Sequence, residues 1–164
     1  MKIDFRDNNL IVFLNKRSIK NVDFFNKSEL ERYFRDLFLD FKNVYDLDLS
    51  GSYDINVYID DCYGVILEII SVDDNYFDYC DVVDMNIVVS KYRNFLYKTD
   101  RFIKNIDSVI YSYNGSFYYE LKNIDFLNLG LVIENSDIIY GEDVYFIKKN
   151  AKKLSDSLVI DKIF

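Results

Sequence analysis

The segment NKSELERYFRDLFLDFK, residues 26–42, carries the clearest periodic pattern in the chain. Its large apolar residues recur every three or four positions: Leu30, Tyr33, Phe34, Leu37, Phe38 and Phe41. This spacing places them on one stripe of an α-helix. Asn26 with Glu29, or Ser28 with Glu31, supplies the side chains of an N-terminal capping box. Burying each large side chain is worth roughly 1.5–3 kcal/mol, so the helix should lie on another layer.

Strand patterns on both sides of this helix indicate that the other layer is a β-sheet. Residues 2–15 predict a hairpin or a bent strand, because apolar and charged residues alternate before the turn-prone Asp7-Asn8-Asn9. Residues 54–70 predict a second hairpin with a five-residue loop that ends at Gly64. Residues 1–71 are therefore expected to form an N-terminal lobe of βαββ type, or ββαββ if the first segment is itself a hairpin, with the helix on one face.

The second half of the chain repeats this order of patterns. A short strand is predicted over residues 85–90, a helix over 94–105 and a hairpin over 108–121. The pair Asn114-Gly115 favours a type I′ turn. The remaining predictions are a helix over 126–134, an apolar stretch over 138–140, a helix over 142–154, and a closing strand or frayed end over 158–164. The fold class is thus α+β, with a second small sheet lobe over residues 85–164 that also carries a helix on one face.

An acidic connector is predicted between the two lobes, over residues 72–84. Residues 71–84 contain five aspartates and neither lysine nor arginine. The stretch lacks the central glycine and the terminal glutamate of an EF-hand loop, so a solvated linker is expected and not a calcium site.

Composition restricts the chemistry that the chain can perform. Its 164 residues include no histidine and two cysteines, Cys62 and Cys80, so the usual zinc sites, disulfide frameworks and His-based catalytic groups are not available. No cofactor or metal is expected, and no carboxylate pair stands out as catalytic. No apolar run approaches a membrane span, and the N-terminus is unlike a signal peptide, so a cytoplasmic protein is expected. The absence of proline and tryptophan is typical of a low-GC genome.

The formal net charge of −8 argues against direct binding to nucleic acid, which requires a basic surface. An acidic surface serves solubility or binds a basic partner protein. Four lysines near the end of the last predicted helix form the one basic cluster: Lys148, Lys149, Lys152 and Lys153. A solvated helix face is the expected role for them.

The order of these segments resembles the MecA family, whose members are adaptors that present substrates to a Clp-type unfoldase–protease. The N-terminal segments that carry the resemblance are MKIDFRDNNLIVFLNKRSI, KSELERYFRDLFLDF and YDINVYIDDCYGVILEIIS. The C-terminal segments are SVIYSYNGSFYYELKN, LNLGLVIENSDIIYG and FIKKNAKKLSDSLVI. The resemblance implies a client-binding N-terminal lobe and a C-terminal lobe that contacts the unfoldase. The connector here is shorter than the long acidic linker of that family.

Two functional hypotheses follow. The first is an adaptor or regulatory protein that binds other proteins. Its candidate contact residues are the hairpin aromatics Tyr111, Tyr113, Phe117 and Tyr119, and the stretch from Glu134 to Glu142. The alternative is an acidic inhibitor, such as phages encode, that mimics nucleic acid and blocks a host enzyme. The sequence names neither the partner nor the oligomeric state.

Overall fold

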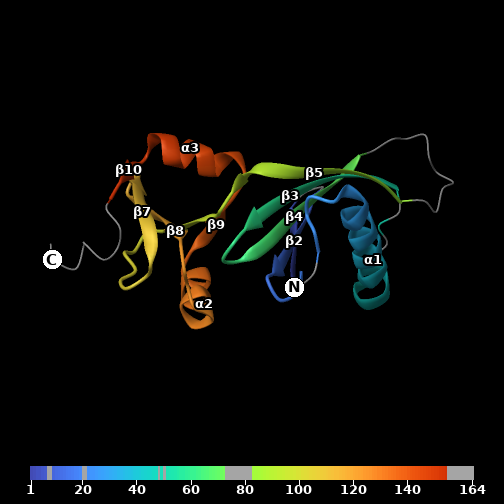
Figure 1. The fold of residues 1–164 in the computed structure, drawn as a ribbon, viewed down its shortest axis with the longest axis horizontal. Coiled ribbons are helices and arrows are strands. Elements are labelled where there is room, and N and C mark those ends of the chain that lie inside the picture. Colours follow the sequence, from blue (N-terminus) through green and yellow to red (C-terminus); the bar gives the residue numbers. More distant parts are fainter. Residues whose placement is uncertain (7–8, 20–21, 48, 50, 73–82, 155–164) are drawn as a thin grey trace. The chain divides into compact units, whose positions relative to one another are not determined.

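The computed structural model describes residues 1–6, 9–19, 22–47, 49, 51–72 and 83–154. Two compact units make up the chain. The first comprises Met1–Val57 and Val65–Ser90, and the second comprises Tyr58–Gly64 and Lys91–Phe164. Within the described residues, each unit has its own five-stranded sheet with helix packed against it, which confirms the predicted α+β class. In Figure 1 the ribbon is coloured by position in the sequence, from blue at the N-terminus to red towards the C-terminus.

The sheet of the first unit has the strand order β1-β2-β4-β3-β5. The strands are β1 (Lys2–Arg6), β2 (Asn9–Asn15), β3 (Gly51–Asp60), β4 (Gly64–Val72) and β5 (Val83–Arg93). β1 and β2 form the predicted N-terminal hairpin, and they are antiparallel with Ile3 opposite Val12. β3 and β4 form the second predicted hairpin. The arrangement before β5 is therefore the ββαββ alternative.

Helix α1 (Lys27–Tyr45) is the predicted amphipathic helix. Its core residues are Leu30, Phe34, Leu37, Phe38 and Phe41. The ring of Phe38 meets Tyr53 of β3 edge to face at 5.7 Å, so the stripe lies on the sheet. Asn26 is the N-cap and accepts the N–H of Glu29 at 3.3 Å, whereas the Glu29 carboxylate accepts the N–H of Asp23. The helix runs past Lys42 and stops where Asp46 takes the left-handed conformation, with φ of 55°.

The structure corrects the prediction for residues 85–90, which were expected to begin the second lobe. The strand expected over residues 85–90 is longer and belongs to the first sheet, beside β3, and not to the second lobe. The side chain of Asn86 donates to Asp54 at 2.9 Å, and Arg35 of α1 donates to the Val83 carbonyl at 3.1 Å. Residues 72, 83 and 84 of the predicted connector are strand residues. The rest of the connector, with Cys80 and the aspartates from Asp73 to Asp81, lies outside the described residues.

The sheet of the second unit has the order β10-β7-β8-β6-β9. Its strands are β6 (Leu96–Thr99), β7 (Ser108–Tyr113), β8 (Ser116–Leu121), β9 (Asp137–Ile139) and β10 (Lys152–Lys153). The hairpin of β7 and β8 is confirmed. Asn114 and Gly115 have φ of 48° and 82°, as a type I′ turn requires. Figure 1 shows helices α2 (Phe126–Glu134) and α3 (Glu142–Asn150) on opposite sides of this sheet.

Two predicted helices of this unit were wrong in whole or in part. Residues 94–105 form β6 and irregular chain, because Leu96 to Thr99 pair with both β8 and β9, and Asn94 and Asn105 adopt left-handed conformations. α3 ends at Asn150 and not at residue 154, because Lys152 and Lys153 pair with β7. The four lysines therefore do not share one helix face. The predicted element over 158–164 lies outside the described residues.

No helix in the described part of the chain combines the length and the apolar character needed to cross a membrane.

Candidate protein-interaction site

The structure does not bring the four predicted hairpin aromatics together on one surface. In the register of β7 and β8, Tyr111 is opposite Tyr118, and Ser112 is opposite Phe117. Because successive side chains of a strand point to opposite faces, Tyr111 and Tyr113 lie on one face of the sheet, and Phe117 and Tyr119 on the other.

Tyr111 and Tyr113 lie on the face that α3 covers. They pack on a core cluster of Leu96, Tyr118, Val144 and Ile147. The ring of Tyr113 meets Phe146 edge to face at 5.9 Å. The hydroxyl of Tyr111 donates to Glu120 Oε2 at 3.1 Å. These two tyrosines therefore contribute to the packing of α3 on its sheet.

Glu120 is the centre of the polar contacts beneath α3. Its carboxylate forms a salt bridge with Lys148 of α3 and also accepts from Tyr111 and from the Asn94 amide. Burial opposes ionisation of Glu120, but the hydrogen bond and charge of Lys148 together with these donors hold its pKa below the ordinary value. Lys148 is thus paired, and is not part of a solvated basic face.

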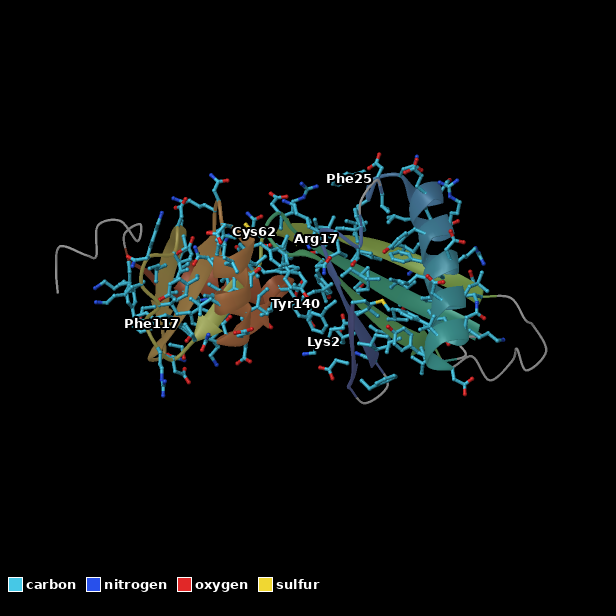
Figure 2. The ribbon with its side chains drawn as sticks, turned by 90° about the horizontal axis from the view of Figure 1, so that it is seen from below. Lys2, Arg17, Phe25, Cys62, Phe117 and Tyr140 are labelled. Carbon is cyan, nitrogen blue, oxygen red and sulfur yellow. The ribbon has the colours of Figure 1, made fainter. Side chains whose placement is uncertain are left out.

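Phe117 and Tyr119 lie on the opposite face of the same hairpin. Tyr119 is completely buried, and its hydroxyl accepts the N–H of Ile103 at 2.8 Å and donates to the Ile103 carbonyl at 3.3 Å. Burial raises the pKa of the Tyr119 hydroxyl. Phe117, labelled in Figure 2, meets the ring of Phe102 edge to face at 5.5 Å. These aromatics hold residues 100–106 against the sheet.

The hairpin tip Tyr58–Gly64 contains a buried carboxylate. Asp60 accepts the backbone N–H groups of Cys62 at 2.9 Å, Tyr63 at 2.6 Å and Phe95 at 2.6 Å. Burial raises the pKa of Asp60 above its ordinary value, although these three donors favour the ionised form. Cys62, labelled in Figure 2, donates its thiol to the Lys122 carbonyl at 3.0 Å. Asp60 therefore stabilises the turn and links it to the backbone N–H of Phe95.

Helix α2 has an exposed apolar face. Its inner side chains, Leu129 and Val132, are buried. Phe126, Leu127 and Leu131 are 62%, 86% and 47% exposed. Leu127 and Leu131 are four residues apart and lie one helical turn above each other. Scattered exposed apolar residues are normal at protein surfaces, but a contiguous group is typical of a contact surface. The sequence signal was a nine-residue helix, FLNLGLVIE, with apolar residues on all sides.

Gly130 lies in the middle of α2, and the described residues show no structural requirement for a glycine there. It has no positive φ, and a Cβ atom placed there would meet nothing within 4 Å. A glycine inside a helix costs about 1 kcal/mol relative to alanine. The stability of α2 would therefore be greater with alanine at this position.

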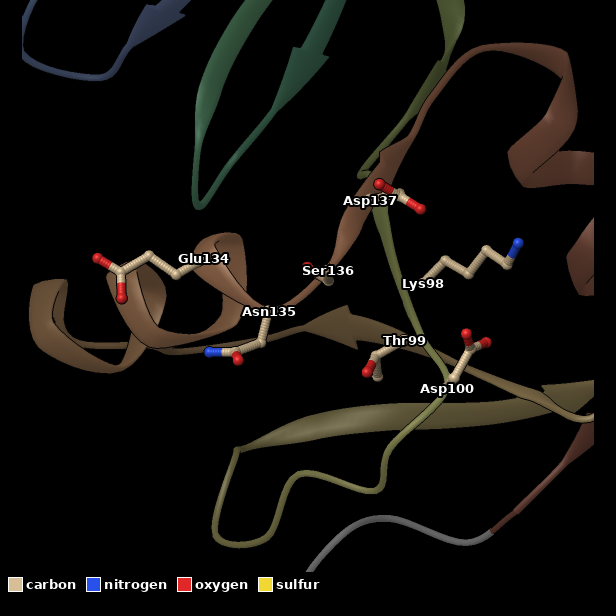
Figure 3. Close-up of a pocket in the computed structure, with 7 residues that line it drawn as sticks. All are labelled: Lys98, Thr99, Asp100, Glu134, Asn135, Ser136 and Asp137. Atoms are coloured by element: carbon tan, nitrogen blue, oxygen red, sulfur yellow. The ribbon is translucent and has the colours of Figure 1, made fainter.

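Glu134 continues the exposed face, because it follows Leu131 by three residues and Leu127 by seven. It borders an open pocket of about 330 Å³ at the C-terminal end of α2, drawn in Figure 3. The lining residues are Lys98, Thr99, Asp100, Glu134, Asn135, Ser136 and Asp137. Three carboxylates and one ammonium group give this lining a net charge of −2. The carbonyl end of the helix adds negative potential.

Glu142 is separate from this pocket lining. It is exposed in the first turn of α3, next to Asp143, where the helix macrodipole favours acidic side chains. Of the two predicted glutamates, only Glu134 borders the pocket.

The described residues contain no group of three side chains that could hold a metal ion. The aspartates behind the nucleic-acid mimicry hypothesis lie in residues 73–81, outside the described part of the chain; Asp84 alone of that run is described, on β5.

Comparison of the chain with protein-family models, with curated proteins and with solved structures finds no match in any of the three.

Proposed function

We propose that this protein is an adaptor or regulatory protein that binds other proteins, and that the outer face of α2 is its contact surface. The observation that carries the proposal is the exposed apolar group of Phe126, Leu127 and Leu131 on one short helix. Leu127 in particular contributes little to the core, because most of its surface meets water. Contact with a partner would remove this apolar surface from water and supply binding free energy.

The hairpin aromatics do not support a contact role of their own, because Tyr111, Tyr113 and Tyr119 are engaged in packing or hydrogen bonds within the second unit. The proposed surface is therefore beside the predicted residues, on α2, and shares only Glu134 with them.

A Clp-type unfoldase is the first partner to test, since the order of sequence segments resembles the MecA adaptors. The experiment is affinity purification of the tagged full chain from its native host, in parallel with the double variant Leu127→Ser/Leu131→Ser. The matched control is Leu39→Ser, which removes a similarly exposed leucine (58%) from α1 in the other unit.

The proposal predicts that at least one protein co-purifies with the wild-type chain and with Leu39→Ser, and is lost with the double variant. Direct titration of that protein, or of a Clp unfoldase, should show the same dependence. Recovery of identical proteins with all three chains would show that α2 is not the contact surface.

A further inference from the structure

The outer face of α2 also indicates what kind of partner it fits, a step that rests on the proposed function. We infer that the partner segment is a short amphipathic α-helix that carries lysine or arginine beside its apolar stripe.

The apolar residues of α2 have the spacing that a helix recognises. Leu127 and Leu131 form a ridge of side chains four residues apart, and Phe126 lies beside the first of them. Ridges of this kind pack into the grooves between the side chains of a second helix. A partner with apolar residues at three-and-four spacing would bury both leucines at once.

Gly130 provides an independent reason for a helical partner. It lies between Phe126 and Glu134 on the exposed side, where a Cβ atom would project into open space. The absence of a side chain there lowers the surface beside the Leu127–Leu131 ridge, so the backbone of a second helix can approach closely. Helix propensity and the described neighbours favour alanine at this position. A residue that departs from the local preference is expected where a functional contact requires it.

Charge determines which side chains the partner carries. Residues 123–137 contain Asp125, Glu134 and Asp137 and neither lysine nor arginine. Glu134 lies in line with the leucine ridge and borders the pocket that Asp100, Asp137 and Lys98 also line. The net charge of this lining is −2. A cationic side chain placed one turn beyond the partner's apolar residues would reach these carboxylates.

A second copy of this chain fits the same face poorly. Three partly exposed side chains amount to a few hundred Å² at most, on the order of half the area of about 800 Å² per partner in a stable interface. An antiparallel pair of α2 helices would also place Asp125 of one copy near Glu134 of the other, and like charges repel. A short basic helix avoids the charge repulsion, and a face of this small area is sufficient for a weak, transient contact with a single helix.

The test uses three amidated 16-residue peptides and the full-length protein in isothermal titration calorimetry. The first peptide is an amphipathic helix of leucine and lysine, the second has glutamate in place of lysine, and the third is a scrambled form of the first. The inference predicts binding of the first peptide only. Leu127→Ser/Leu131→Ser should weaken that binding by about tenfold or more, and Leu39→Ser should leave it unchanged.

Two single variants test the glycine and the charge. Gly130→Ala should raise the thermal stability of the protein and yet weaken binding of the leucine–lysine peptide several-fold. Glu134→Gln should weaken binding by about threefold and reduce its dependence on salt, whereas Glu142→Gln, which removes one negative charge elsewhere in the unit, should not.

Several results would overturn the inference. Equal binding of the scrambled or glutamate peptide would show that neither the helical pattern nor the cations matter. If the control variants Leu39→Ser and Glu142→Gln lose as much binding as the α2 variants, the peptide does not bind at the outer face of α2. Tighter binding in Gly130→Ala would show that the glycine does not serve close approach of a second helix. Self-association in sedimentation that disappears in the double leucine variant would identify a second copy as the occupant. If the purified partner depends on Leu127 and Leu131 but contacts them without a basic helix, the proposed function stands and this inference fails.

Discussion

Replacement of Asp60 by alanine should destabilise the second unit more than any other substitution at the tip of the β3–β4 hairpin. The carboxylate accepts three backbone N–H groups at 2.6–2.9 Å, and two of them, Cys62 and Tyr63, belong to the turn itself. The third, Phe95, is 35 residues away and fully buried as a donor. Alanine has no acceptor, so all three donors would lose their partner.

The magnitude follows from the burial of each donor. A buried N–H without a partner costs about 1–3 kcal/mol, whereas a partly exposed one can bind water instead. The Phe95 group should therefore account for most of the effect, and Asp60→Ala should lower the free energy of unfolding by about 2–4 kcal/mol. Asp60→Asn retains one oxygen acceptor, so its cost should be about 1–2 kcal/mol. Asp61→Asn changes an exposed neighbour and is the control, with an expected effect within about 0.5 kcal/mol.

Urea unfolding followed by circular dichroism would measure these differences, and hydrogen exchange at the Phe95 amide would locate them. Because the pKa of Asp60 is raised in the folded protein, protons bind more tightly to the folded than to the unfolded state. The stability that Asp60 contributes is therefore complete below its ordinary pKa of about 3.9 and declines as pH rises through the folded pKa. The stability difference between wild type and Asp60→Asn should accordingly be largest in acid and smaller at neutral pH.

Equal stability of Asp60→Ala and Asp61→Asn would refute the reasoning, as would unchanged exchange of the Phe95 amide in Asp60→Ala. A stability difference between wild type and Asp60→Asn that grows as pH rises would show that the three N–H donors outweigh burial.

Three further predictions use other contacts. Lys148→Met leaves the half-buried Glu120 carboxylate without its cation and should lower the free energy of unfolding by about 1–2 kcal/mol at pH 7, measured in urea. Because the pKa of Glu120 is lowered in the folded protein, this loss of stability should become smaller as pH falls below about 4.5. Gly141→Ala should lower the free energy of unfolding by about 2–4 kcal/mol in thermal unfolding, because φ of Gly141 is 67° and the added Cβ would lie 2.9 Å from the Tyr58 ring. A change in stability of less than about 0.5 kcal/mol would contradict this prediction. Asn26→Ala should cost about 1 kcal/mol by loss of the N-cap of α1, measured as faster amide exchange in its first turn.

Local pattern was sufficient for the elements whose stabilising contacts are close in sequence. The stripe and cap of α1 lie within a single segment, and the Asn114-Gly115 turn specifies its own hairpin. The separation of Tyr111 from Phe117 onto opposite faces also follows by counting across a two-residue loop, because side chains alternate along each strand.

Contacts with residues distant in sequence determined the elements that local patterns predicted incorrectly. Residues 96–99 form an interior strand of the second sheet because β8 and β9 pair with them on both sides. Lys152 and Lys153 form a strand and do not continue α3, because they pair with β7. Asp60 closes its own turn through local contacts, but its hydrogen bond to the Phe95 N–H depends on the tertiary structure.

The sequence by itself determined the fold class, the main helix and the hairpins, because helix and strand periodicity and turn chemistry act over a few residues. Only the tertiary structure decided which apolar side chains remain at the surface. Leu129 and Leu131 are equivalent as residues, but the sheet covers the first and leaves the second in water. Burial is a property of the neighbours that a side chain meets in space, and those neighbours are set by the packing of the whole unit.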